Sequence, residues 1–157
     1  MKTLILWTTA LIVLAATAFF IWKATDRRPQ LSRLIYSGNA KALDEFLTKH
    51  PSLSNAKNVD WEGKGMTPLH LAAYMGNSEI LKVLLDHHAN TEARDKRGLT
   101  PLLWTTFVGN PQAAAALLSG GADINAKGRD GRTALEMAKL SLNQEMIALL
   151  RERGAKE

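Results

Sequence analysis

Hydrophobic and polar residues follow two different patterns along this chain. Leu4 to Trp22 is a run of 19 residues that contains no charged side chain. Beyond Arg28 the sequence changes to short amphipathic segments separated by glycine. One of them, Ser78–Asp86, places Ile80, Val83 and Leu84 on a single helical face. The pattern predicts one apolar N-terminal helix followed by a series of short helices that pack together.

The apolar run has the length and the flanks of a membrane anchor. At ~1.5 Å per residue, a helix of 19 residues covers ~28 Å, close to the ~30 Å thickness of a bilayer's hydrocarbon core. Trp7 and Trp22 lie near its ends, where aromatic rings prefer the interface, and Lys2 and Lys23 close it with charges. We therefore expect a transmembrane helix at residues 4–22, within an N-terminal segment 1–28 that ends in a basic linker.

A cleaved secretory signal is the alternative for the same segment. Lys2, the apolar run and Ala16-Thr17-Ala18 resemble an n-region, an h-region and a cleavage site. Cleavage there leaves Phe19-Phe20-Ile21-Trp22 at the new N-terminus, so we favour the uncleaved anchor over this signal. A buried core helix is disfavoured because the run lacks a polar stripe. The basic residues that follow the run lean toward a cytoplasmic body, and the side of the membrane stays open.

The remainder of the chain contains an internal repeat. Gly65–His70, Gly98–Leu103 and Gly131–Glu136 are similar hexapeptides, and their threonines at 67, 100 and 133 are equally spaced. With a first, degenerate unit, this period divides the chain into four units, at about residues 30–64, 65–97, 98–130 and 131–157. The first unit needs five additional residues, which fit in a loop between residues 57 and 64.

The motif and its spacing resemble the ankyrin repeat, whose period is about 33 residues. Thr67-Pro68-Leu69-His70-Leu71-Ala72 matches T-P-L-H-x-A, in which threonine caps a helix and proline occupies its first position. The resemblance implies an all-α fold: an ankyrin-repeat solenoid of about four helix-turn-helix units with hairpin loops, at residues 29–157. The third unit departs from the motif at Leu103 and Trp104, which we interpret as a repacked core in preference to a binding adaptation.

Charge and composition exclude several classes of protein. Of the formal net charge of +5, residues 1–28 carry +3, with four basic side chains against Asp26. The body keeps only +2, which argues against a nucleic-acid partner. The absence of cysteine excludes disulfides, thiolate zinc sites and cysteine nucleophiles.

The sequence contains no catalytic or metal-binding pattern with the spacing that such a site requires. His87 and His88 are adjacent, so their side chains diverge around a helix and cannot share one metal ion. His70 belongs to the repeat motif, and in ankyrin-like proteins that histidine is structural. The glycines around Lys64 lack the spacing of a phosphate-binding loop. We therefore expect no enzyme activity, no cofactor and no metal.

The resemblance implies a protein-binding surface, because ankyrin-like proteins bind partners through their hairpin tips and the exposed side of the first helix of each unit. These elements line one concave face, whose tips carry more basic than acidic residues. Trp61, in the inserted loop, is expected either to pack on the first unit or to contact a partner. The predicted partner-binding residues are Trp61, Met66, Tyr74, Met75, Arg94, Lys96, Arg97, Leu99, Phe107, Val108, Lys127, Arg129 and Arg132.

These features predict a non-catalytic, membrane-tethered adaptor that acts as a monomer. Its expected partner is a protein with an acidic and apolar surface, because the concave face combines apolar and basic residues. The alternative is a secreted or periplasmic protective or inhibitory factor that uses the same face after signal cleavage.

Overall fold

The computed structural model describes residues 26–60 and 62–156. Within these ranges the regular elements are all helical: α2 (Arg28–Ser37), α3 (Ala40–Lys49), the 3-10 helix η1 (Pro51–Asn55), α4 (Pro68–Met75), α5 (Ser78–Asp86), α6 (Pro101–Val108), α7 (Pro111–Ser119), α8 (Ala134–Leu140) and α9 (Gln144–Glu152). None of these helices is long and apolar enough to cross a membrane. The predicted span at residues 4–22 lies outside the described residues.

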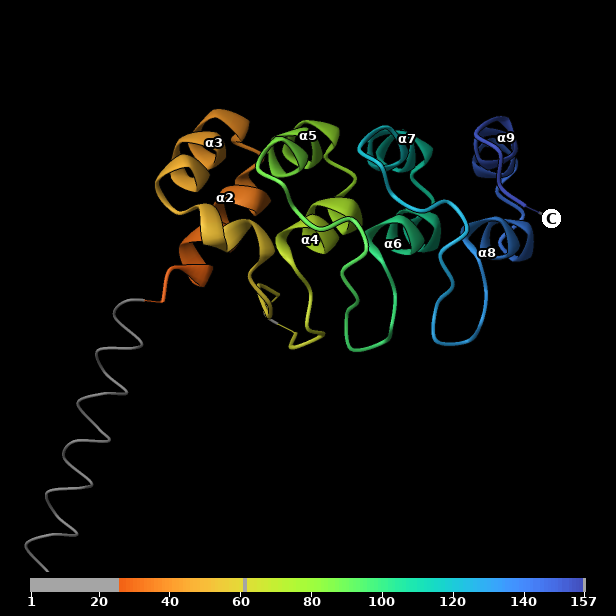
Figure 1. The fold of residues 1–157 in the computed structure, drawn as a ribbon, viewed down its shortest axis with the longest axis horizontal. Helices are drawn as coiled ribbons and strands as arrows, with labels where there is room; N and C mark the ends of the chain where they lie inside the picture. Colours follow the sequence, from red (N-terminus) through yellow and green to blue (C-terminus); the bar gives the residue numbers. More distant parts are fainter. Residues whose placement is uncertain (1–25, 61, 157) are drawn as a thin grey trace, which may run out of the picture.

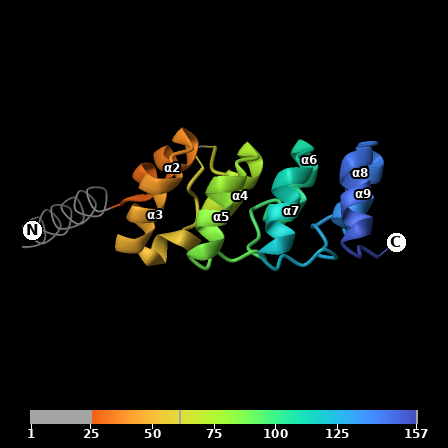
Figure 2. The ribbon, with the colours of Figure 1, turned by 90° about the horizontal axis from the view of Figure 1, so that it is seen from above.

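The helices form two layers, and loops extend from one side of them. In Figure 1, α3, α5, α7 and α9 make the upper layer, and α2, α4, α6 and α8 make the lower layer. Three loops extend below the lower layer between successive pairs. Figure 2 shows the four helix pairs following one another in a single row. This arrangement is the solenoid predicted from the regular spacing of the motif.

The first helix of each repeat begins at the predicted threonine. Thr67 and Thr133 form capping boxes, with His70 and Glu136 respectively at the third helical position. The side chain of Thr100 accepts a hydrogen bond from the Leu103 amide at 3.4 Å. The three threonines therefore occupy equivalent places along one stack, as their spacing predicted.

The second helix of every unit begins at an asparagine. Each asparagine side chain accepts a hydrogen bond from the amide three residues later, at 2.8 to 3.1 Å. The four caps are Asn39, Asn77, Asn110 and Asn143. The same cap therefore starts the second helix at the same place in each unit.

The preceding helices end in the left-handed conformation in three different units. Gly38, Gly76 and Gly109 have φ of 68°, 67° and 76° at the helix ends. A Cβ atom on Gly76 would lie 2.1 Å from Nδ2 of Asn110, so the neighbouring cap also requires glycine there. In the fourth unit Leu142 adopts φ of 55° at the equivalent position. This leucine is 76% exposed.

The core runs continuously between the layers from the first unit to the last. It includes fully buried leucines of every pair, among them Leu31, Leu69, Leu102 and Leu150. Such a core is built from contacts between neighbouring units, because no single helix pair can bury its apolar face alone. The inserted loop closes on itself, where Asp60 accepts hydrogen bonds from the amides of Lys64 and Met66.

Candidate protein-binding surface

One exposed apolar side chain per unit lies at the same position of the first helix. This row, called here the exposed row, consists of Tyr36, Tyr74, Phe107 and Leu140, which are 41%, 45%, 55% and 67% exposed. The predicted residues Met75 and Val108 lie beside it and are 38% and 37% exposed. Large apolar side chains that repeat at equivalent positions form a contiguous surface more readily than scattered ones do. The row is therefore a candidate for contact with a partner.

Trp104 supports the middle of the exposed row from beneath. Its side chain is buried, with 1% exposed, and its ring meets those of Tyr74 and Phe107 edge to face, with centroids 5.6 and 5.4 Å apart. The indole Nε1 donates a hydrogen bond to Oδ2 of buried Asp95 at 2.9 Å. The predicted repacking of the third unit is confirmed, and it fixes two surface aromatic rings in place.

Two basic side chains cover this aromatic cluster. The Arg97 guanidinium carbon lies 5.5 Å from the Trp104 ring centroid and 5.2 Å from that of Phe107. Lys64 Nζ lies 5.6 Å from Trp104 and 5.7 Å from Tyr74, distances at which cation–π attraction operates. Lys64 also pairs with Glu62, and that hydrogen bond raises the pKa of Lys64. The centre of the concave face thus combines exposed aromatic rings with positive charge.

Two predicted binding residues brace neighbouring hairpins. The Arg94 guanidinium donates to the carbonyl of Gly98 at 2.9 Å and to that of Lys127, in the next hairpin, at 2.6 Å. Lys96 donates from Nζ to the Gly63 carbonyl at 2.7 Å, and its amide donates to the Lys64 carbonyl at 2.9 Å. Successive hairpins are therefore linked, although these two side chains remain exposed.

The other predicted basic residues also lie on the hairpin surface. Lys127 and Arg129 are exposed, and Arg129 packs its Cβ close to Gly98 of the preceding hairpin. Arg132 pairs with Asp130 at 3.1 Å, a contact in which both side chains are about half exposed. An ion pair this accessible contributes little to stability. These three side chains therefore remain available to an external negative charge.

For two residues the predicted place on the binding surface is wrong. Met66 and Leu99 are 2% and 7% exposed and belong to the core. Each precedes the capping threonine, where the hairpin returns to the helices, so its side chain turns inward. Leu99 also donates its amide to Asp95 and accepts from His70 Nε2 at 2.9 Å. Trp61 lies outside the described residues, so its predicted alternatives stay open.

The sequence prediction also missed members of this surface. Tyr36 was hidden by the longer first interval of the repeat, and counting back from Tyr74 with the insertion included identifies it. Lys64 lies one repeat period before Arg97, a spacing that was sufficient to find it. Tyr36 joins the concave face because α2 takes the place of a first helix in the stack, and Lys64 because the first hairpin, despite its insertion, ends in register with the others.

His70 is held in a structural role. Its Nδ1 accepts from the Thr67 amide at 3.2 Å, which leaves Nε2 to donate to the Leu99 carbonyl. Burial lowers the pKa of His70 and keeps the ring neutral. Within the described ranges, no group of three or more histidine, aspartate or glutamate side chains is placed to hold a metal ion.

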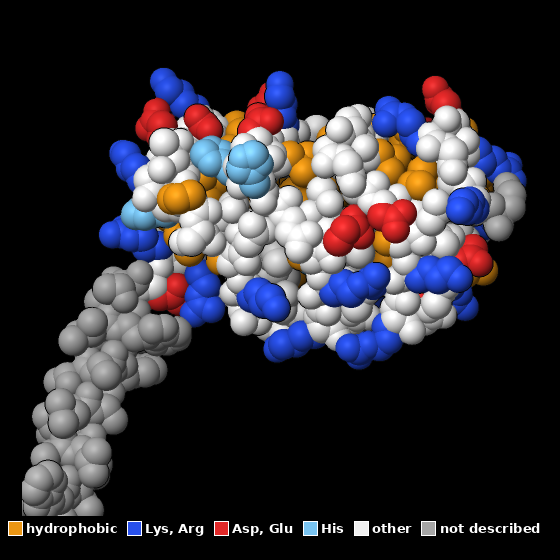
Figure 3. Space-filling model, viewed as in Figure 1, with side chains coloured by type: hydrophobic (Ala, Val, Ile, Leu, Met, Phe, Trp, Pro, Cys, Tyr) orange, Lys and Arg blue, Asp and Glu red, His pale blue; other side chains and the backbone are white. Residues whose placement is uncertain are grey.

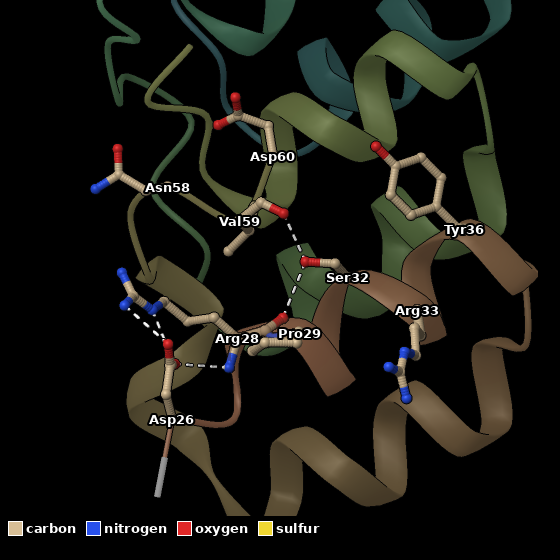
Figure 4. A pocket seen from close by; sticks show the side chains of 9 residues that line it. All are labelled: Asp26, Arg28, Pro29, Ser32, Arg33, Tyr36, Asn58, Val59 and Asp60. Atoms are coloured by element: carbon tan, nitrogen blue, oxygen red, sulfur yellow. Dashed lines mark hydrogen bonds and ion pairs between the residues drawn. The ribbon is translucent and has the colours of Figure 1, made fainter. Parts of the chain in front are cut away.

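A pocket of about 450 Å³ lies at the N-terminal end of the stack, between α2 and the inserted loop (Figure 4). Several of its polar groups are used internally. Asp26 pairs with Arg28 at 2.8 Å, and this hydrogen bond lowers the pKa of Asp26. Ser32 Oγ lies 2.9 Å from the Arg28 carbonyl oxygen and 2.5 Å from that of Val59. These contacts join the first helix to the inserted loop and show no arrangement of acid, base and nucleophile.

Comparison with known proteins agrees with this architecture. Residues 31–128 match the family model for ankyrin repeats in three copies. This match covers more than half of the chain, so the protein belongs to the ankyrin-repeat family.

Several larger proteins resemble part of the chain. A transient receptor potential cation channel subfamily A member 1 homolog from Caenorhabditis elegans is 39% identical over 75 residues, which cover 46% of this chain and 6% of the relative. The BTB/POZ domain and ankyrin repeat-containing protein NBCL from Lupinus angustifolius is 34% identical over 41% of this chain and 16% of its own length. The E3 ubiquitin-protein ligase MIB2 from Gallus gallus is 36% identical over 37% of this chain and 6% of its own length.

Proposed function

We propose that the protein is a non-catalytic, membrane-tethered adaptor that captures another protein through its concave face. Membership of the ankyrin-repeat family supports a role in protein–protein interaction. The observation that carries the proposal is the exposed row, in which Tyr74 and Phe107 flank the buried ring of Trp104 beneath the Arg97 guanidinium.

The energetics of interfaces favour such a surface. Aromatic and arginine side chains provide most of the free energy at binding hot spots, particularly where their conformations are fixed before binding. Here Trp104 holds Phe107 in place, and the Arg97 guanidinium lies close to both rings. An apolar side chain of the partner would cover the rings, and a neighbouring carboxylate would pair with Arg97 or Arg132. The partner is therefore a protein with an apolar and acidic surface.

The membrane tether is the second part of the proposal. It rests on the charge-free run from Leu4 to Trp22, which is long enough to span a bilayer as a helix. Five residues, Lys23–Arg27, separate this run from α2, the first helix of the repeats. A linker this short confines the concave face to the membrane surface, where it raises the effective concentration of the adaptor for membrane-bound partners.

Export after signal cleavage is the second candidate. It is favoured by Lys2 before the apolar run and by Ala16-Thr17-Ala18 near its end. The exported chain would use the same face to inhibit or protect a soluble protein. Mass spectrometry of the mature N-terminus separates the two: retention of Met1 supports the tether, and a start at Phe19 supports export.

Partner capture tests the binding surface. Membranes that contain the full chain are solubilised, and co-purified proteins are compared for the wild type, Phe107→Ser and Arg97→Glu. We expect each variant to capture at least tenfold less partner than the wild type, since a hot-spot residue contributes about 2 kcal/mol or more to the binding free energy. Lys82→Glu is the matched control, because Lys82 is exposed on the outer helix α5. Undiminished capture by both variants, with unchanged circular dichroism, would exclude this surface.

A further inference from the structure

We propose that the hairpin side of the solenoid docks on an anionic phospholipid bilayer, so that the body lies with its hairpin tips against the membrane. The proposal rests on the membrane tether above and adds an orientation and a lipid class to it. It assigns the outward basic residues of the tips to lipid headgroups, while the exposed row remains the surface for a protein partner.

The charge of the body is divided between two sides. The start of α2 and the three hairpin segments, at residues 26–28, 57–64, 94–99 and 127–132, contain ten basic and five acidic residues. The rest of the chain from residue 29 onward contains eight basic and ten acidic residues. The net charge is therefore +5 on the first set and −2 on the second. A body that looks nearly neutral as a whole is thus strongly polarised.

The basic segments lie on the same side of the stack. In Figure 1, the ends of all three hairpins are found below the lower helical layer, and α2 begins at the lower edge of that layer, on the same side. Figure 3 shows Lys and Arg side chains along this lower edge, whereas Asp and Glu are prominent higher on the same face. The outward basic residues, Lys127 and Arg129 among them, therefore lie along one edge, because the hairpins of a repeat protein extend in parallel, whereas Lys64 and Arg97 cover the aromatic cluster.

The hairpins present this edge as a braced surface. Arg94 bridges the second and third hairpins through the Lys127 carbonyl, and Lys96 bridges the second and first through the Gly63 carbonyl. Lys127 and Arg129 are exposed on the third hairpin. Fixed charges lose less conformational entropy on docking than charges on a flexible tail. Basic clusters beside a membrane span are attracted to anionic lipid, and each residue adds to that attraction.

The position of the tether favours lipid over an acidic protein as the occupant of this edge. The described chain begins at Asp26, on the hairpin side. Five residues, Lys23–Arg27, lie between the apolar run and α2, and even fully extended they reach at most about 18 Å, so the apolar run holds the hairpin side near the bilayer. At physiological salt the Debye length is about 8 Å, so the basic edge and anionic headgroups attract each other appreciably once they come within about that distance, which so short a linker permits.

Energy transfer to labelled lipid tests this orientation in the full chain. The sequence contains no cysteine, so Lys127→Cys and Lys82→Cys each accept a single donor fluorophore and each remove one lysine. The labelled proteins are placed in nanodiscs of phosphatidylcholine alone or with about one third phosphatidylglycerol, with an acceptor on the headgroups. We expect stronger transfer from position 127 than from position 82 in the anionic discs, and a smaller difference in the neutral discs or at high salt.

Charge reversal supplies the second arm of the test. In the Lys127→Cys protein, Arg129→Glu should lower the docking equilibrium roughly tenfold or more, whereas Lys82→Glu should leave it unchanged. Equal transfer from positions 127 and 82 in both lipids overturns the orientation. Loss of partner capture in detergent by Arg129→Glu, with transfer unchanged, assigns the tips to an acidic protein instead. If alkaline carbonate extracts the wild-type protein from membranes, the protein has no transmembrane anchor, and the proposed tether is wrong whatever the energy transfer shows.

Discussion

Replacement of Asp95 should reveal how strongly the second hairpin is fastened to the stack. This carboxylate is 6% exposed and accepts three hydrogen bonds: from the Arg97 amide at 2.9 Å, the Leu99 amide at 2.8 Å and Trp104 Nε1 at 2.9 Å. Asp95→Ala leaves all three donors without this acceptor. Hydrogen bonds to a charged group are worth about 1.5–3 kcal/mol each, and water at the hairpin recovers part of that. We therefore expect a loss of about 3–4 kcal/mol in the free energy of unfolding.

Urea denaturation of the full chain in mild detergent, followed by circular dichroism, measures this loss. With an m-value of about 1.5–2 kcal/mol per molar urea, the midpoint should fall by about 2 M. Asp130→Ala is the matched control, because this carboxylate lies in the next hairpin and is 49% exposed. Its cost should stay below about 1 kcal/mol. Similar losses for the two variants would refute the view that Asp95 anchors Trp104 and the hairpin.

Three further predictions concern the stability of the repeats. Burial lowers the pKa of His70, so below pH 6.5, the ordinary pKa of histidine, the unfolded chain binds a proton that the folded ring does not. The free energy of unfolding should therefore be constant above this pH and fall below it. Thermal melts of His70→Leu should show a weaker fall. Gly76→Ala should cost about 2 kcal/mol in urea denaturation, from its φ of 67° and the displaced Asn110 cap, and a cost under about 0.5 kcal/mol contradicts this. Leu142→Gly should raise the free energy of unfolding by about 0.5–1 kcal/mol, and with it the melting temperature, since an exposed leucine occupies a left-handed helix end. A lower melting temperature would contradict the reasoning.

The helical framework was accessible from the sequence because its signals are local. Thr67 and Thr133 each cap a helix through residues three positions away, and Gly76 ends one through its own backbone. These features recur once in each repeat, so each unit supported the interpretation of the others. Leu142 was not anticipated, because the stack imposes a left-handed helix end there even without glycine.

The binding surface was less accessible because it depends on contacts between units. Met66 and Leu99 are apolar residues of exposed loops in sequence, but the return of the hairpin to the core buries them. Sequence alone also could not separate Arg94, which braces two hairpins, from Arg97, which covers an aromatic cluster. Arg94 reaches a carbonyl one repeat away, at Lys127, whereas Arg97 lies over Trp104 and Phe107 of its own unit, and both contacts depend on how the hairpin folds back on the stack.

Site-specific photo-crosslinking in native membranes tests the binding surface most directly. A photoreactive amino acid replaces Phe107 on the exposed row or Lys82 on the outer layer, each in the full chain. We expect a discrete crosslinked protein from position 107, which is lost when Arg97→Glu is added, and none from position 82. A crosslinked partner from position 82, with none from position 107, would contradict capture by the concave face.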